Sequence, residues 1–161
     1  MTLDQIMDRA ILPALDLLPP DMGDARAKAT LLAIGLQESR FMHRRQINGP
    51  ARGFWQFELG GGVKGVLTHR ASASMARAIC RERGIEPLHD KVYAALERDD
   101  VLAAALARLL LWTDPYHLPE VGDAEGAWDL YMRVWRPGKP HRKTWDTLYA
   151  QARTATLEAV A

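Results

Sequence analysis

One segment of twelve residues, VLAAALARLLLW at positions 101–112, constrains the fold of this chain more than any other. Its residues are apolar on almost every side of a helix, so a helix here has no face suited to solvent. Twelve residues with an arginine among them are too few to span a bilayer. Asp99 and Asp100 come just before the segment, where an acidic side chain can cap a helix. The sequence therefore predicts a central helix that other elements bury.

Most of the remaining chain is also predicted to be helical. An apolar stripe at helical spacing runs from Leu3 to Leu18, and Pro13 is expected to break or kink it. Asp21 or Asp24 can cap the next helix, which we expect to continue to about Ser39. Further helices are expected over about 72–83, 92–96, 124–135 and 145–157.

Strand signals are absent from the sequence, because β-branched residues do not recur at period two. The glycine-rich stretch 48–65 is expected to be mostly irregular backbone. With 161 residues, 48% of them hydrophobic and 25% charged, the chain can bury one core. We predict a single all-α domain over residues 1–161.

Charge and cysteine content argue against several classes of function. A net charge of +1 gives no overall basic field for nucleic acid. Cys80 is the only cysteine, and the five histidines are scattered, so no intramolecular disulfide, metal site or cofactor is predicted. The N-terminus has no basic region followed by an apolar run, and we expect no signal peptide and no stable membrane insertion.

Glu38 is the most unusual polar residue of the predicted helices. At helical spacing it shares a face with Leu31, Ile34 and Phe41, the apolar face expected to turn toward the core. Apolar surroundings disfavour the charged carboxylate and raise its pKa. A carboxylic acid that stays protonated near neutral pH can act as a general acid. An ion pair with a nearby arginine such as Arg40 is the structural alternative.

A glycine turn follows Glu38 at a distinctive distance. Glu38-Ser39, then Gly53-Phe54-Trp55-Gln56 fifteen residues beyond the glutamate, then Trp135-Arg136-Pro137-Gly138, form an ordered pattern. This pattern resembles the lytic transglycosylase and goose-type lysozyme group of the lysozyme superfamily. The resemblance covers about residues 27–140 and is strongest over 36–58. It implies a lysozyme-like fold, with the catalytic glutamate at a helix end beside a glycine-rich loop.

The pattern also departs from that family. Phe54-Trp55 replaces the usual aliphatic pair, and Trp135 and Arg136 stand where tyrosine and asparagine are usual. The resemblance implies that Glu38 protonates the leaving oxygen of a β-1,4 glycosidic bond in peptidoglycan. In lytic transglycosylases the same glutamate then acts as base, while a muramyl hydroxyl closes an anhydro ring. In a hydrolytic lysozyme a second carboxylate activates water. Glu58 matches such an acidic position, and both reactions remain open.

The other candidate site residues are expected to bind substrate. They are Ser39, Gly53, Trp55, Gln56 and Trp135. The resemblance implies that the Ser39 hydroxyl orients the glutamate or a substrate acetamido group, although bonding to backbone is equally open. Gln56 is expected to touch sugar, and the two tryptophans can stack on sugar faces or belong to the core. Gly53 is expected to have a role in the backbone, by allowing a positive φ or a close approach.

A basic group of residues could line one side of the cleft or simply be solvated. It consists of Arg40, His43, Arg44, Arg45, Arg52, Arg136, Lys139, Arg142 and Lys143.

The partner expected from the resemblance is the glycan strand of peptidoglycan, bound by a monomer. The segment NGPARGFWQFE resembles sequences of bacteriophage or prophage cell-wall enzymes. Such an endolysin-like protein is made in the cytoplasm and acts on the wall during lysis or entry. A non-catalytic wall-binding or virion module and a small helical nucleic-acid binder are the competing classes.

Overall fold

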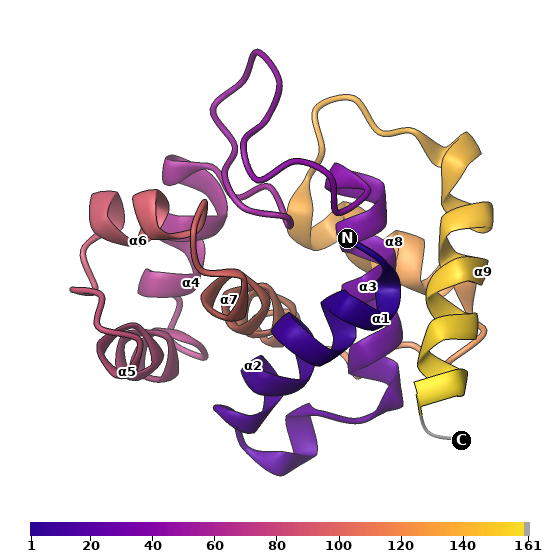
Figure 1. Cartoon of the computed structure of the whole chain (residues 1–161), viewed down its shortest axis with the longest axis horizontal. Coiled ribbons are helices and arrows are strands. Elements are labelled where there is room, and N and C mark those ends of the chain that lie inside the picture. The colour runs from indigo at the N-terminus through magenta and orange to yellow at the C-terminus, as the bar shows by residue number, and fades with distance from the viewer. Residues whose placement is uncertain (160–161) are drawn as a thin grey trace.

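The computed structural model describes residues 1–159 and is mainly helical over that range, with no β-strand. The helical segments, in chain order, are α1 (Leu3–Ile6), η1 (Met7–Ile11), α2 (Leu12–Asp16), η2 (Pro20–Met22), α3 (Ala25–Ser39), η3 (Leu59–Val63), α4 (Lys64–Thr68), α5 (Ala73–Glu82), α6 (His89–Ala95), α7 (Asp100–Trp112), α8 (Ala124–Trp135) and α9 (Arg142–Ala159). Figure 1 shows α3 and α7 in the middle, with α4, α5 and α6 at one end and α8 and α9 at the other. The prediction of an all-α fold is confirmed.

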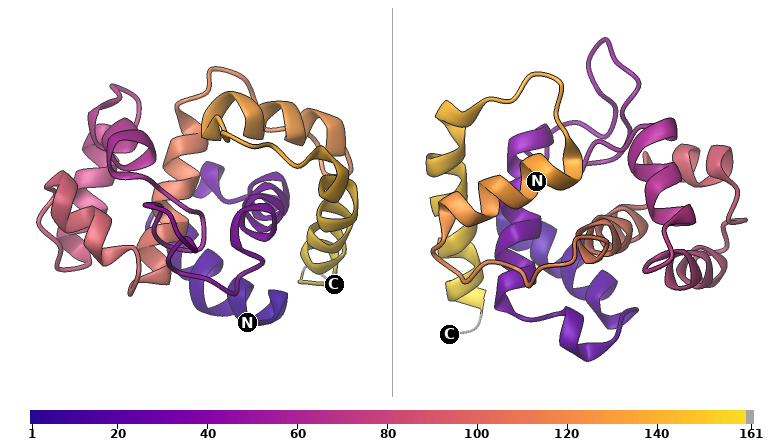
Figure 2. Two further views of the ribbon diagram at one scale, coloured as in Figure 1. Left: turned by 90° about the horizontal axis from the view of Figure 1, so that it is seen from above. Right: turned by 180° about the vertical axis from the view of Figure 1, so that it is seen from behind.

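Helix α7 is the buried centre that its sequence predicts. Every residue from Leu102 to Leu111 is buried, including Arg108. The Asp99 side chain caps the helix by accepting a hydrogen bond from the backbone N–H of Leu102 at 3.0 Å. Helix α7 packs against η1, α2, α3, α4 and α5. The two views of Figure 2 show the other helices arranged around it.

Helix α3 is a second buried helix, which the sequence does not anticipate. Asp24 caps its start by accepting a hydrogen bond from the N–H of Ala27 at 3.0 Å, so of the two predicted caps Asp24 is the one used. The helix is buried on all sides from Ala29 to Leu36. Helix α9 covers much of it. The expected amphipathic helix with one apolar face is therefore wrong for α3.

Helix α3 ends at Ser39 as predicted, but Phe41 does not lie on the helical face expected for it. Arg40 takes a left-handed conformation with φ +56° and stops the helix, and Phe41 follows with φ +53°. Phe41 therefore leaves the helix and folds back onto Gly35, where a Cβ would collide with its ring. Glycine at position 35 thus permits this close approach. Glu38 keeps its face with Leu31 and Ile34, but Phe41 is not part of that helical face.

The break in the first helix has a simple backbone cause. Pro13 has no N–H, and the chain accommodates it with a π-helical turn in which the Leu12 N–H donates to Met7 O. The predicted interruption of the first helix is confirmed. The expectation that 48–65 is mostly irregular backbone is confirmed as far as Glu58, and η3 and α4 follow directly afterwards.

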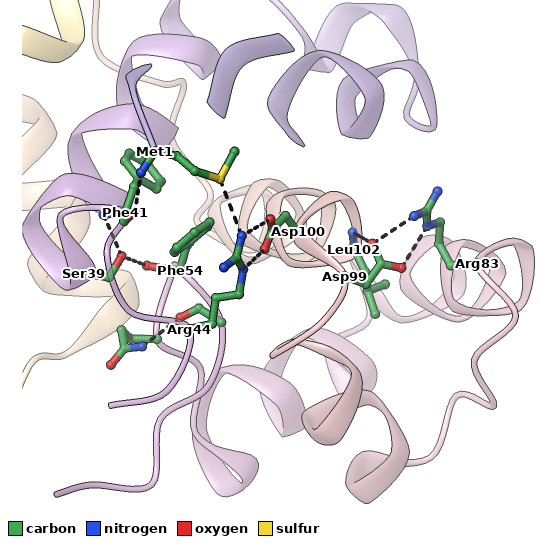
Figure 3. A network of polar contacts seen from close by, with 11 residues as sticks. Met1, Ser39, Phe41, Arg44, Phe54, Arg83, Asp99, Asp100 and Leu102 are labelled. Carbon is green, nitrogen blue, oxygen red and sulfur yellow. Dashed lines mark hydrogen bonds and ion pairs between the residues drawn. The ribbon is translucent and has the colours of Figure 1, made fainter. Parts of the chain in front are cut away.

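Ion pairs hold the segment from Arg40 to Glu58 against α7 and the turn before it, and Figure 3 shows the pair between Arg44 and Asp100. The Arg44 guanidinium makes two contacts of 2.9 Å with the Asp100 carboxylate at the start of α7. Arg45 and Arg52 both pair with Glu97, at 2.9 and 2.6 Å. These contacts fix a segment that has no helical hydrogen bonds of its own. It follows that a long irregular loop is held in one position beside the end of α3.

Candidate functional site

Glu38 lies half-buried in the last turn of α3, and its carboxylate has one defined partner. The Tyr131 hydroxyl on α8 donates a hydrogen bond of 2.6 Å to Glu38 Oε1. The pKa of Glu38 is raised from 4.5 to about 7, chiefly by burial; the hydrogen bond from Tyr131 acts against this rise, and the nearby charge of Glu58 adds to it. A group with this pKa is close to half protonated at neutral pH. It can therefore give and accept a proton under the same conditions.

Tyr131 is held in place by a stack of aromatic rings. Its ring stacks on Trp145 of α9 with centroids 5.5 Å apart and planes 9° apart, and it tilts against Trp128 at 5.4 Å. Burial, with the charge of Glu38, raises the pKa of Tyr131 well above its ordinary value, so the phenol stays protonated. The hydroxyl is thus a permanent donor with a fixed position. It orients the carboxyl of Glu38.

Sequence reasoning does not identify Tyr131 as a site residue. One signal points to it, since Tyr131 stands four residues before Trp135 in a predicted helix and so shares its face. The resemblance places Trp135 at the usual tyrosine position. The side chain that reaches the glutamate belongs instead to the tyrosine one turn earlier.

Ser39 faces the interior of the protein. Its hydroxyl is buried, with Oγ 2.7 Å from the Phe54 carbonyl oxygen, to which it donates. The same Oγ accepts a hydrogen bond of 3.1 Å from the N–H of Phe41. Both partners are backbone groups, as Figure 3 shows. The backbone interpretation of Ser39 holds, and its hydroxyl is not available to a substrate.

Gly53 and Trp55 form the inner side of the glycine turn. Gly53 has φ +77°, and a Cβ there would lie 3.1 Å from Leu96 O, so its role is in the backbone as expected. Trp55 is only 1% exposed, and its indole N–H donates to Leu31 O at 2.8 Å. Its ring packs edge-on against Phe41. The expectation that Trp55 stacks on sugar is wrong, because α3 and Phe41 cover its ring.

Gln56, Glu58 and Trp135 come together on the outer side of the turn. All three line a cavity of about 640 Å³. Gln56 has φ +54°, and its side-chain amide donates to Gly53 O at 2.8 Å. The Trp135 indole N–H donates to Trp55 O at 2.9 Å, which joins α8 to the turn. These three positions are the ones the structure offers for contact with a ligand.

The two candidate carboxyl groups have different surroundings. Glu58 is exposed, stands just before η3 and lines the cavity. Glu38 is half-buried behind the turn and is not among the residues that line this cavity. Glu58 therefore stands at the cavity wall, whereas Glu38 lies half-buried in contact with Tyr131, and the negative charge of Glu58 contributes to the raised pKa of Glu38.

Four of the nine residues of the basic group form ion pairs. Arg44 pairs with Asp100, Arg45 and Arg52 share Glu97, and Arg142 pairs with Asp146. Of the residues in that group, Arg136 alone lines the cavity. Lys64 of α4 and His69 directly after α4 line it as well, and the basic group as predicted from sequence does not include them.

Other features of the described chain bear on binding. Within residues 1–159, no three His, Cys, Asp or Glu side chains gather in a way that suits a metal ion. The described helices include none of the length and apolarity needed to cross a membrane. No protein-family model, curated protein or solved structure matches this chain.

Proposed function

We propose that this protein cleaves the β-1,4 bond between N-acetylmuramic acid and N-acetylglucosamine in bacterial peptidoglycan, with Glu38 as the proton donor. The observation that carries this proposal is the state of Glu38. Its half-buried carboxyl has a pKa of about 7 and is oriented by Tyr131 at 2.6 Å. The substrate class comes from the resemblance of Glu38-Ser39 and Gly53–Gln56 to lytic transglycosylases and goose-type lysozymes.

The proposed reaction begins with proton transfer from Glu38 to the glycosidic oxygen. The C–O bond to the leaving sugar breaks, and positive charge develops at the ring carbon and ring oxygen. The acetamido group of the substrate stabilises this centre. Glu38, now ionised, takes the proton of the muramyl hydroxyl as that oxygen closes the anhydro ring. A single carboxyl with a pKa near neutrality suits both steps, because each protonation state is populated.

Hydrolysis is the second candidate reaction, and one observation favours it. The charge of Glu58 raises the pKa of Glu38, so a second carboxylate lies within electrostatic range. Glu58 is exposed at the cavity wall, where water has access to it. In this reaction Glu58 activates a water molecule that attacks the sugar, and the product is a reducing end.

A non-catalytic wall-binding or virion module is the third candidate. It is favoured by the position of Glu38 outside the set of residues that line the cavity. In such a protein the cavity holds glycan, while the contact between Glu38 and Tyr131 only joins α3 to α8. Activity on purified wall separates this candidate from the two enzymes.

The test is product analysis on purified peptidoglycan. We expect the wild type to release muropeptides with anhydro ends, which mass spectrometry finds one water lighter than reducing ends. Glu38→Gln should lower the rate by about 10²–10⁴-fold, since it removes the general acid. Glu58→Gln should keep the rate within a few-fold, because transglycosylation needs one protein carboxyl.

Three outcomes contradict parts of the proposal. Reducing ends that disappear in Glu58→Gln indicate the hydrolytic reaction. Equal rates for Glu38→Gln and wild type exclude Glu38 as the acid. Binding of the wild-type protein to wall without any release of muropeptides indicates the non-catalytic module.

A further inference from the structure

A second cavity adjoins the candidate site. It has a volume of about 470 Å³ and is formed by the start of α3, the end of α7 and the segment that follows α7. Asp114 and Pro115 line this cavity and also the cavity that contains Glu58. The two cavities therefore meet at the same short segment of backbone. A ligand long enough to cross that segment can occupy both.

Two exposed aromatic rings line the second cavity. Trp112 at the end of α7 is 41% exposed, and Tyr116 four residues later is 72% exposed. Each ring has a guanidinium near it, with Arg108 5.6 Å from the Trp112 centroid and Arg133 5.5 Å from the Tyr116 centroid. Large exposed rings in a cavity offer the flat apolar surface on which the apolar face of a ligand ring can stack.

The polar groups of this cavity are fixed before any ligand arrives. The Asp114 side chain is 7% exposed and accepts two hydrogen bonds from Arg133, at 3.1 and 3.2 Å. Asp24 is held by the backbone N–H of Ala27 and by the Nε–H of Arg26 at 2.9 Å. Preorganised carboxylates and guanidinium groups can bind hydroxyls without a further cost of ordering.

The Arg108 guanidinium supplies hydrogen-bond donors to this cavity. It is 4% exposed, and its Nε–H donates to Met22 O at 2.8 Å. Burial lowers its pKa to about 10, and no carboxylate in the described chain forms an ion pair with it. A buried cation without a paired anion retains donors that a neutral polar ligand can satisfy. The neighbouring charges of Asp21 and Asp24 make a neutral ligand more suitable here than an anion.

We propose that this cavity is a distal saccharide site, which holds β-1,4-linked N-acetylated sugars of the same glycan strand whose bond is cleaved beside Glu38. Sugars have flat apolar faces and neutral hydroxyl edges, which match the exposed rings and the fixed polar groups of the cavity. This inference rests on the proposed function, since it assumes that the ligand of the adjoining cavity is a glycan. Its consequence is a preference for long strands over short ones.

The test measures binding of sugar oligomers to a variant that does not cleave them. In the Glu38→Gln background, calorimetry compares the trimer and the octamer of β-1,4-linked N-acetylglucosamine. We expect Tyr116→Ala to weaken octamer binding by about three- to tenfold, while trimer binding changes less. Tyr116→Phe keeps the ring and should keep the wild-type affinity for the octamer. Leu88→Ala is the control, because Leu88 is an exposed apolar residue that lines neither cavity.

An unchanged octamer affinity in Tyr116→Ala overturns the distal site, and so does the absence of octamer binding to every variant. Cleavage of peptidoglycan is measured separately on the wild type. Cleavage together with Tyr116-independent octamer binding contradicts only the distal site. Tyr116-dependent octamer binding without any cleavage contradicts the enzymatic proposal and leaves a glycan-binding protein.

Discussion

The inner and outer sides of the turn Gly53–Glu58 differ in almost every physical property. On the inner side, Phe54 and Trp55 are buried and pack in the core. On the outer side, Gln56 and Glu58 line a cavity of about 640 Å³. One short motif thus supplies both the support of the site and its accessible surface. A motif residue that is close to the site in sequence therefore need not reach a ligand.

Glu38 stands at the boundary between these two sides. Its backbone belongs to the buried helix α3, and its carboxyl meets Tyr131 of α8 rather than solvent alone. The inner side supplies the burial that raises its pKa, while the outer side supplies the charge of Glu58. The properties of the candidate acid therefore depend on both sides, and variants on each side should affect it differently.

The largest expected difference between the sides is in stability. Trp55→Ala should lower the free energy of unfolding by about 3–5 kcal/mol, because it leaves a large cavity in the core and removes the indole donor to Leu31 O. Trp135→Ala should cost about half as much, since Trp135 is only partly buried. Urea denaturation of both variants measures the difference.

Equal losses of stability in Trp55→Ala and Trp135→Ala would contradict the division into an inner and an outer side. Glycan binding gives a second measurement on the same proteins. Trp135→Ala, at the cavity wall, should weaken binding of an N-acetylglucosamine oligomer to a folded protein. A folded Trp135→Ala protein with unchanged oligomer affinity would remove Trp135 from the binding surface.

The sequence predicts the positions of the helices well and the burial of their faces poorly. The apolar segment 101–112 and the caps Asp24 and Asp99 are local signals, and the helices that they predict are present. Helix α3 is covered on all sides because α9 and α7 both pack on it. Such coverage depends on elements far away in the chain, which local periodicity does not report.

The same limit applies to the candidate site. The raised pKa of Glu38 follows from its apolar neighbours and is predictable from helical spacing. Whether Trp55 or Trp135 faces the cavity depends on how α8 meets the turn, through the hydrogen bond from Trp135 to Trp55 O. The contact of Tyr131 with Glu38 joins residues 93 positions apart in the chain. Spacing within one motif cannot predict contacts of this kind.

The next expected difference is the pH dependence of stability. Folding raises the pKa of Glu38 from 4.5 to about 7, so the folded state binds more protons than the unfolded state between these values. Stability should therefore fall as pH rises through this range, by about 3 kcal/mol in total. Glu38→Gln should lack this loss and be the more stable protein above pH 7. Urea denaturation at several pH values measures both proteins.

Glu58→Gln is the matched control for this pH dependence. Its carboxyl is exposed, so the variant should retain most of the wild-type loss of stability between pH 4.5 and about 7. If Glu38→Gln and wild type lose stability in parallel over that range, the burial of the Glu38 carboxyl has no energetic consequence. In that case Glu38 has no raised pKa to keep its carboxyl protonated near neutral pH.

The smallest expected effects come from the two groups that adjust the pKa of Glu38 in opposite directions. The hydroxyl of Tyr131 stabilises the ionised carboxylate, so Tyr131→Phe should remove about 1–2 kcal/mol of that stabilisation and raise the pKa. The phenylalanine ring can keep the stack on Trp145. Glu58→Gln removes a neighbouring negative charge and should lower the same pKa.

The side-chain carboxyl carbon of Glu38, followed by NMR across pH, reports both shifts without any need for activity. Shifts of opposite sign would show that the buried side and the cavity side act on one carboxyl. Shifts of the same sign would mean that one of the variants changes the burial of Glu38, and the two sides would then not be separable at this residue.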